Sequence, residues 1–357
     1  MQFDFADILI EVMERKASDL HLTAGSPPMI RQRGALLALD LPKLTPQDTR
    51  EIVYSILTND QRQRLETDLQ VDLSYSIPGR ARFRVNAYFQ RAAIGAALRL
   101  IPSEMPQLET LGLPPVLAEF TRKPRGFVLV TGPTGSGKST TLAAMIDKIN
   151  RDRHEHIMTV EDPIEFLHPH RNCIVNQREL GSDAQSFALA LKAALRQDPD
   201  VILVGEMRDL ETISTALTAA ETGHLVFATL HTQDTAQTVD RMVDVFPPEQ
   251  QHQVRVQLSV SLQGIVTQQL LPTADGQGRA VATEVLVPTP AVRNLVREGK
   301  THQIYSALQT GGSHGMQTMD ASLADLVRRG RISRELAESR SSTPEELRRL
   351  MGTVRVA

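Results

Sequence analysis

One segment, residues 127–149, restricts the possible folds of this chain more than any other. A strand-like apolar run, 127–131, leads into a glycine-rich loop, and a stretch of helical composition, 141–149, follows. The loop reads Gly132-Pro133-Thr134-Gly135-Ser136-Gly137-Lys138-Ser139-Thr140. This order of strand, G-x-x-x-x-G-K-[ST] motif and helix is typical of a phosphate-binding loop. The glycines let backbone N–H groups turn inward around a phosphate at the helix N-terminus. The segment predicts an α/β domain that binds a nucleotide.

Two side chains of this loop have defined tasks if the ligand is ATP with Mg²⁺. Lys138 is expected to reach the β- and γ-phosphates, and the Ser139 hydroxyl is expected to ligate Mg²⁺. The other residues of 132–140 would hold phosphate through the backbone. The alternative is an ordinary glycine-rich turn before a helix. Every fixed position of the motif is filled, however, and a strand precedes it.

Three more short apolar runs predict a parallel sheet beside the loop. They are residues 157–160, 201–204 and 225–228. Helical stretches separate them, which is typical of a buried sheet in an α/β domain. Glu161 and Glu165 follow the first run, and Glu206 follows the second. Ligands bind at the carboxyl ends of such strands, so we expect these carboxylates near the γ-phosphate and its metal.

The three carboxylates are predicted to have different roles in hydrolysis. Glu206 is expected to polarise the attacking water. Gly205 occupies the position at which a Walker B strand usually carries aspartate, so direct protein ligation of Mg²⁺ would be limited to Ser139. Glu161, Glu165 and Glu206 would then act through metal-bound water. The alternative for these carboxylates is a surface or helix-capping role. A regulator that binds ATP without turnover is an alternative for the whole protein, but the intact Lys138, Ser139 and Glu206 argue against it.

Two histidines flank the third apolar run, within Gly223–Thr232. His231 follows the strand and is expected to hydrogen-bond the γ-phosphate and respond to its loss. His224, at the other end, is a second candidate nucleotide contact. Neither histidine has a third or fourth ligand nearby, so a zinc site is not predicted.

The remainder of the chain predicts a small α+β domain, a linker and a helical C-terminal part. Residues 1–100 show a helix at 3–16, strands at 19–22, 68–75 and 81–100, a hairpin at 29–39, two helices within 45–65 and a turn at Pro78-Gly79. Residues 101–115 are proline-rich and predict an interdomain linker. The second domain, 116–357, is mostly helical from Pro247. Its last helix is expected to begin at Thr343, with a capping box completed by Glu346.

Composition excludes several classes of protein. The net charge of −3 argues against a general nucleic-acid coat. The single cysteine, Cys173, cannot form an intrachain disulfide, so a reducing compartment fits best. No stretch approaches the roughly 18 apolar residues of a membrane-spanning helix, and the N-terminus lacks the features of a secretory signal. We expect a soluble, cytoplasmic protein whose membrane association, if any, is made through a partner.

The phosphate loop, the acidic segment 161–165, the Gly205-Glu206 strand end and the paired histidines resemble the secretion ATPase superfamily of type II and type IV systems. Two further segments resemble its pilus retraction ATPases of the PilT type. One is Ala17-Ser18-Asp19-Leu20-His21-Leu22-Thr23-Ala24-Gly25. The other, which is similar to that group's C-terminal retraction motif, is Ala291-Val292-Arg293-Asn294-Leu295-Val296-Arg297-Glu298-Gly299-Lys300-Thr301. Assembly and secretion relatives usually carry an extra N-terminal domain and a four-cysteine element, and the lack of both favours retraction.

The resemblance implies a PAS-like N-terminal domain, a RecA-like ATPase domain and a homohexamer. It also implies a place at the inner face of the cytoplasmic membrane, at the pilus base, with an inner-membrane platform protein as partner. An accessory retraction ATPase of the PilU type is an alternative identity and a possible partner, and a pilus assembly or type II secretion ATPase is a further alternative. From the residues alone, 291–301 is also compatible with an ordinary amphipathic surface helix that ends at Gly299.

An arginine-rich run precedes the expected linker: Arg80, Arg82, Arg84, Arg91 and Arg99. Alternation places the first three on one strand face, with Phe83 and Val85 on the other. The resemblance implies that such arginines, Arg84 and Arg99 foremost, approach the nucleotide of an adjoining subdomain or subunit, where an arginine can be worth roughly 10³–10⁵ in rate. The alternatives are a solvated edge strand or the basic channel of a RecA-like nucleic-acid motor. Because few aromatic residues are available to stack bases, no nucleic-acid partner is expected.

Overall fold

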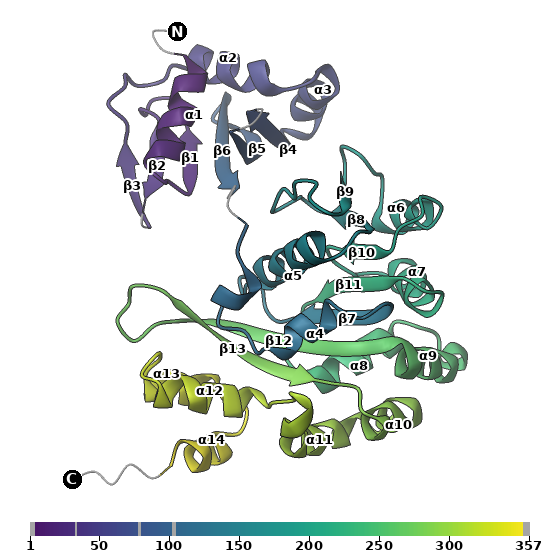
Figure 1. The fold of residues 1–357 in the computed structure, drawn as a ribbon. Coiled ribbons are helices and arrows are strands. Elements are labelled where there is room, and N and C mark those ends of the chain that lie inside the picture. The colour runs from purple at the N-terminus through teal and green to yellow at the C-terminus, as the bar shows by residue number, and fades with distance from the viewer. Residues whose placement is uncertain (1–3, 33, 78–79, 102–104, 353–357) are drawn as a thin grey trace, which may run out of the picture. The chain divides into compact units, whose positions relative to one another are not determined.

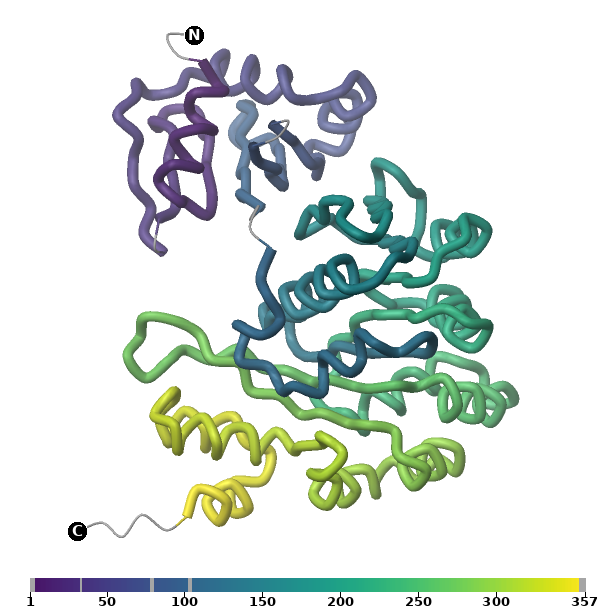
Figure 2. Tube along the Cα trace, viewed as in Figure 1, coloured from purple at the N-terminus to yellow at the C-terminus, as the bar shows by residue number. Residues whose placement is uncertain are grey.

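The computed structural model describes residues 4–32, 34–77, 80–101 and 105–352. The chain divides into two compact units, residues 1–104 and 105–357. Figures 1 and 2 colour the first unit purple to blue and the second from blue through teal to yellow. Among the helices of these described ranges, none combines the length and the apolar character that crossing a lipid bilayer requires.

The first unit is an antiparallel sheet of six strands with helices packed on one face. The strands lie in the order β3-β2-β1-β6-β5-β4. They are β1 (Asp19–Leu22), β2 (Met29–Gln32), β3 (Ala35–Ala38), β4 (Gln70–Ile77), β5 (Ala81–Gln90) and β6 (Ala93–Ile101). The helices are α1 (Phe5–Glu14), α2 (Pro46–Ile56) and α3 (Asn59–Asp68). Their apolar sides share one core with the inward-facing residues of the sheet, which confirms the predicted small α+β domain.

The run 81–100, expected as one strand, is a hairpin. It turns at Arg91 and Ala92, whose φ angles of 48° and 60° lie in the left-handed region. The sequence signals for such a turn are glycine and asparagine, and neither is present here. The turn expected at Pro78-Gly79 lies outside the described residues.

The arginine face of the first unit agrees with the predicted alternation. Phe83 and Val85 are fully buried, whereas Arg84 is exposed on the other face. Strand β5 lies between β6 and β4, so it is not an edge strand, and that alternative is wrong.

The second unit is built on a seven-stranded sheet in the order β13-β12-β7-β11-β10-β8-β9. The strands are β7 (Gly126–Thr131), β8 (His156–Glu161), β9 (Ile174–Glu179), β10 (Val201–Val204), β11 (Leu225–Leu230), β12 (Leu262–Pro272) and β13 (Arg279–Leu286). Strands β7 to β12 run parallel and β13 is antiparallel to β12. The four apolar runs named from the sequence are β7, β8, β10 and β11, as predicted.

Helices cover both faces of this sheet, and strand alternation explains why. In β7, Phe127 and Leu129 join one apolar core, and Val128 and Val130 join the other. Helices α4 (Val116–Phe120) and α5 (Lys138–Asp152) close the second core. The first core is closed mainly by α6 (Phe187–Ala194), α7 (Leu210–Glu221), α8 (Thr235–Asp244) and α9 (Pro248–Ser261). The fold class predicted from the sequence is therefore confirmed (Figure 1).

The region after Pro247, expected to be mostly helical, also holds a long hairpin. Helix α9 passes directly into β12, which pairs with β7 and with β13 and so extends the sheet. Periodicity does not reveal β12, because Thr267 and Gln268 are polar and yet buried. The remaining helices are α10 (Pro290–Glu298), α11 (Ile304–Thr310), α12 (Met319–Arg328), α13 (Arg334–Arg340) and α14 (Pro344–Met351).

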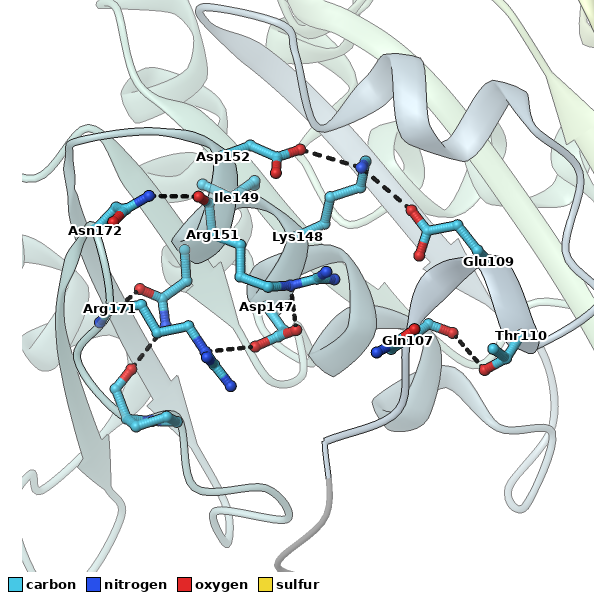
Figure 3. A network of polar contacts seen from close by, with 12 residues as sticks. Gln107, Glu109, Thr110, Asp147, Lys148, Ile149, Arg151, Asp152, Arg171 and Asn172 are labelled. Atoms are coloured by element: carbon cyan, nitrogen blue, oxygen red, sulfur yellow. Dashed lines mark hydrogen bonds and ion pairs between the residues drawn. The ribbon is translucent and has the colours of Figure 1, made fainter.

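Most of the segment expected as a linker, 101–115, belongs to the second unit. The division between the units follows Glu104, and Leu108 is 5% exposed in the core beneath α5. Glu109 pairs with Lys148 of α5 at 3.2 Å, and Lys148 also pairs with Asp152 at 3.1 Å (Figure 3). The prolines obscured the apolar residues that fix this segment to the second unit.

The last helix begins after Thr343 as expected, but the predicted capping box does not form. The Thr343 side chain makes no capping hydrogen bond. The Glu346 carboxylate instead accepts hydrogen bonds from the Tyr305 hydroxyl at 2.8 Å and from the Gln309 amide at 2.7 Å. The Glu346 carboxylate thus binds side chains of α11 instead of the N-terminus of its own helix.

A candidate nucleotide-binding site

The phosphate loop connects the end of β7 to the start of α5 and depends on its glycines. Gly132 has φ +135°, and a Cβ there would lie 2.3 Å from the backbone oxygen of Gln268. Gly135 and Gly137 have φ +78° and +89°. These angles favour glycine, and they bend the loop so that its backbone leads into the helix N-terminus.

Lys138 is held inside this loop. Its side chain is almost fully buried, and Nζ donates to the backbone oxygens of Gly132 at 2.8 Å and Pro133 at 3.1 Å. Burial lowers the pKa of the ammonium group, although the charges of Glu206 and Glu165 oppose this effect. A cation held by two neutral carbonyls is well placed to exchange them for phosphate oxygens.

Glu206 lies at the carboxyl end of β10 and is held by two side chains. Its carboxylate accepts from Nη2 of Arg208 at 2.6 Å and lies 2.9 Å from Nε2 of His231. The hydrogen bond from Arg208 keeps the pKa of Glu206 below its usual value, against the effect of partial burial. The group is therefore an anion that can accept a hydrogen bond from water. Sequence reasoning missed Arg208, although it stands two residues from Glu206.

Glu161, at the end of β8, has a different environment. Its carboxylate accepts from the Thr159 hydroxyl at 2.7 Å and from the Gln177 amide at 3.0 Å. Burial raises the pKa of Glu161, and these hydrogen bonds oppose that rise. Gly205 lies beside it, and a Cβ on Gly205 would be 3.2 Å from the Glu161 Cα. Gly205 thus lets the ends of β8 and β10 approach closely, at the position where a Walker B strand usually carries aspartate.

The structure separates the two histidines. His231 follows the carboxyl end of β11 and contacts Glu206, as expected of a residue near the γ-phosphate. His224 precedes β11, where its backbone oxygen accepts from Gly126 at the start of β7, and its ring contacts the Ala219 carbonyl. Six strand residues separate the two ends, or about 20 Å. Because the strands are parallel, His224 lies at their opposite ends, and this position disfavours its predicted contact with a nucleotide.

A chain of threonine hydroxyls joins the His231 segment to the phosphate loop. Thr232 lies 2.7 Å from Thr238 of α8, which reaches Thr131 at 3.5 Å. Thr131 in turn lies 2.8 Å from Thr267 of β12. The last residue of β7 is thereby tied to two segments more than 100 positions away.

Comparison with known proteins shows the family. A family model described as type II/IV secretion system protein matches residues 3–338. The chain belongs to this family. It is 53% identical to the type IV pilus retraction ATPase PilT of Pseudomonas aeruginosa over 342 residues, which covers 96% of this chain and 99% of the relative. It is 41% identical to the type IV pilus ATPase PilU of the same organism, with 97% and 90% covered. The crystal structure of the pilus retraction motor PilT with bound ADP matches it with a TM-score of 0.92 at 52% identity, covering 97% and 99%.

In this type II/IV secretion system protein, the segment 291–301 forms helix α10 and the residues after it. Val292 and Val296 are buried, and Gly299 ends the helix with φ +69°. The Arg293 guanidinium donates to the backbone oxygens of Ser259 at 2.6 Å and Val260 at 2.9 Å, at the end of α9. Arg293 therefore caps α9, whereas Asn294 and Arg297 are exposed.

The two arginines singled out in the first unit of this family member are cross-strand neighbours. Arg84 of β5 is paired with Arg99 of β6, and Arg99 is paired with Asp19 of β1. The Arg99 Nε atom donates to Asp19 Oδ1 at 2.8 Å, so Arg99 is anchored by the segment Ala17–Gly25. Arg84 and Arg99 are both exposed on this face of the sheet.

Proposed function

We propose that this chain is the subunit of an ATP-hydrolysing motor that powers retraction of a type IV pilus. The observation that carries the proposal is 53% identity to a pilus retraction ATPase along nearly the whole of both chains. The lower identity of 41% to PilU disfavours the accessory type. The complete phosphate loop with Glu206 and His231 beside it supports turnover rather than passive nucleotide binding.

The geometry supports a direct route to hydrolysis. Lys138 would leave the carbonyls of Gly132 and Pro133 and neutralise charge on the β- and γ-phosphates. The ionised Glu206 would accept a hydrogen bond from the attacking water and orient it for in-line attack. His231, held against Glu206, would contact the γ-phosphate and lose that contact once phosphate leaves.

The residues present fit a bound Mg²⁺. Ser139 is the second residue of α5 and is partly exposed at the loop. Its hydroxyl would ligate the ion, and Glu161, Glu165 and Glu206 would hold its waters, since oxygen donors are those that Mg²⁺ prefers. When bound, the ion would neutralise charge on the phosphate oxygens.

We further propose that the motor is a homohexamer at the inner face of the cytoplasmic membrane. Its partner there would be an inner-membrane platform protein, contacted through the 291–301 segment, and an accessory retraction ATPase could join it. The alternatives of an assembly or secretion ATPase and of a nucleic-acid motor predict different phenotypes. Deletion of the gene should leave more surface pili and abolish twitching. A deletion strain without pili would contradict retraction, and ATPase activity stimulated by nucleic acid would favour the other class of motor.

Alanine at Asn294 or Arg297 should block retraction while ATP turnover stays within about twofold of wild type, because both side chains are exposed on α10. Twitching and ATPase activity should be measured on the same variants, with ring integrity checked by light scattering. Arg293→Ala is the comparison, since it removes the cap of α9 and should lower thermal stability as well. Equal loss of turnover and twitching in the Asn294 and Arg297 variants would show that the segment is only structural.

Arg84→Ala should lower the ATPase kcat of intact hexamers by about 10²–10³-fold, because we propose that Arg84 completes the nucleotide site of a neighbouring subunit. Arg99→Ala should act in the same direction, with an added effect because Asp19 would keep Ser18 and the more distant Arg31 but lose its short ion pair. Arg64→Ala is the matched control, an exposed arginine of α3 in the same unit. Near-normal turnover in the Arg84 variant would contradict the proposal.

A further inference from the structure

Strand β12 places one side chain, Gln268, against the inside of the phosphate loop. Gln268 is 1% exposed, and its Nε2 donates to the backbone oxygen of Ser136 at 2.8 Å. A Cβ on Gly132 would lie 2.3 Å from the backbone oxygen of Gln268, and one on Gly137 would lie 3.2 Å from its Nε2. The loop therefore meets this residue at its first position and again at Ser136 and Gly137.

We propose that Gln268 is a positioning residue for the nucleotide phosphates. A loop with three glycines at positive φ loses much backbone freedom when it closes around a phosphate. A hydrogen bond from a buried strand to the middle of that loop holds it in the turned form before the ligand arrives. Pre-organisation of this kind raises affinity because less ordering remains to be done on binding.

The chemistry of position 268 supports a role beyond packing. Gln268 Oε1 and the Ser136 hydroxyl are both buried, and neither has a hydrogen-bond partner within the described ranges. Buried polar atoms without partners destabilise a fold, so an apolar side chain would serve a purely structural position better. The side-chain amide at position 268 therefore serves as a hydrogen-bond donor to the loop. The preceding residue, Thr267, bonds Thr131, so consecutive residues of β12 hold both the entry and the interior of the loop.

The decisive variant is Gln268→Met, which keeps side-chain length but removes the donor. Affinities of the purified protein for ADP with Mg²⁺, for inorganic pyrophosphate and for adenosine should be measured by calorimetry. We expect about 5- to 20-fold weaker binding of ADP and pyrophosphate, the size of one lost hydrogen bond, with adenosine unaffected. The KM for ATP should rise more than kcat falls. The Tm of the nucleotide-free protein should change by only a few degrees, because the variant removes a buried unpaired oxygen but also takes the donor from the Ser136 carbonyl.

Two further variants test a stronger effect and the absence of an effect on nucleotide affinity. Gln268→Glu replaces the donor with an anion beside the phosphates and should weaken ADP binding by roughly 100-fold. Gln269→Ala, at the adjacent and partly exposed position, should leave every affinity unchanged. Gln268→Ala repeats the test if the methionine variant does not fold. The proposal is overturned by a folded variant with wild-type affinity for ADP and pyrophosphate, or by equal weakening of adenosine, which would indicate general disruption of the site.

Discussion

Replacing Lys138 with alanine is expected to abolish ATP hydrolysis, with a loss of at least about 10³-fold in kcat/KM. The ammonium is the cation that the loop itself presents to the β- and γ-phosphates, and its contacts with the Gly132 and Pro133 carbonyls show that it already lies within the loop. Loss of a buried charge should leave the nucleotide-free fold intact. Phosphate release by purified hexamers measures the effect.

Lys148→Ala is the matched control for this change. Lys148 lies on the same helix but pairs with Glu109 and Asp152 (Figure 3). Its loss should leave ATP turnover nearly unchanged, because Lys148 pairs with two half-exposed carboxylates outside the phosphate loop. Substantial turnover by the Lys138 variant would contradict the assignment of the phosphate loop as the catalytic site.

Replacing Glu206 with glutamine is expected to retain ATP binding and to lower kcat by about 10²–10⁴-fold. The amide has nearly the same shape but carries no negative charge with which to polarise water. Hydrogen bonding by Arg208 keeps the pKa of Glu206 low, so the carboxylate is ionised at neutral pH and the substitution removes a full charge. Binding of a fluorescent ATP analogue and single-turnover hydrolysis separate the two effects.

Glu161→Gln and Glu165→Gln identify the base by comparison. Burial raises the pKa of Glu161, and Thr159 and Gln177 both donate to its Oε1 atom, which fixes the side chain and fits a supporting role. Glu165 is exposed and acts on Lys138 through its charge. Wild-type kcat in the Glu206 variant together with an inactive Glu161 or Glu165 variant would show that the base is misassigned.

The phosphate loop and the carboxyl ends of the parallel strands are the parts of the site that the sequence predicts. The phosphate loop was predictable, because its conformation depends on glycines within nine consecutive residues and on the strand and helix that flank them. The carboxyl edge of the sheet was predictable from strand direction, which places Glu206 and His231 together. The same argument disfavours His224, since a residue that precedes a parallel strand lies at the other end of the strands.

Residues that act across long sequence separations were not predictable in this way. Gln268 reaches Ser136 only because β12 pairs with β7, and no local pattern marks a polar residue that will be buried there. From the sequence, Arg293 resembles a surface cation on an amphipathic helix, whereas in the structure it donates to backbone oxygens at the end of α9. Arg84 and Arg99 share one row because two strands pair in one register. Neighbouring residues determine backbone propensity and strand direction. Strand register and packing depend instead on the burial of apolar faces that are distant in sequence, and register and packing decide which polar groups become partners.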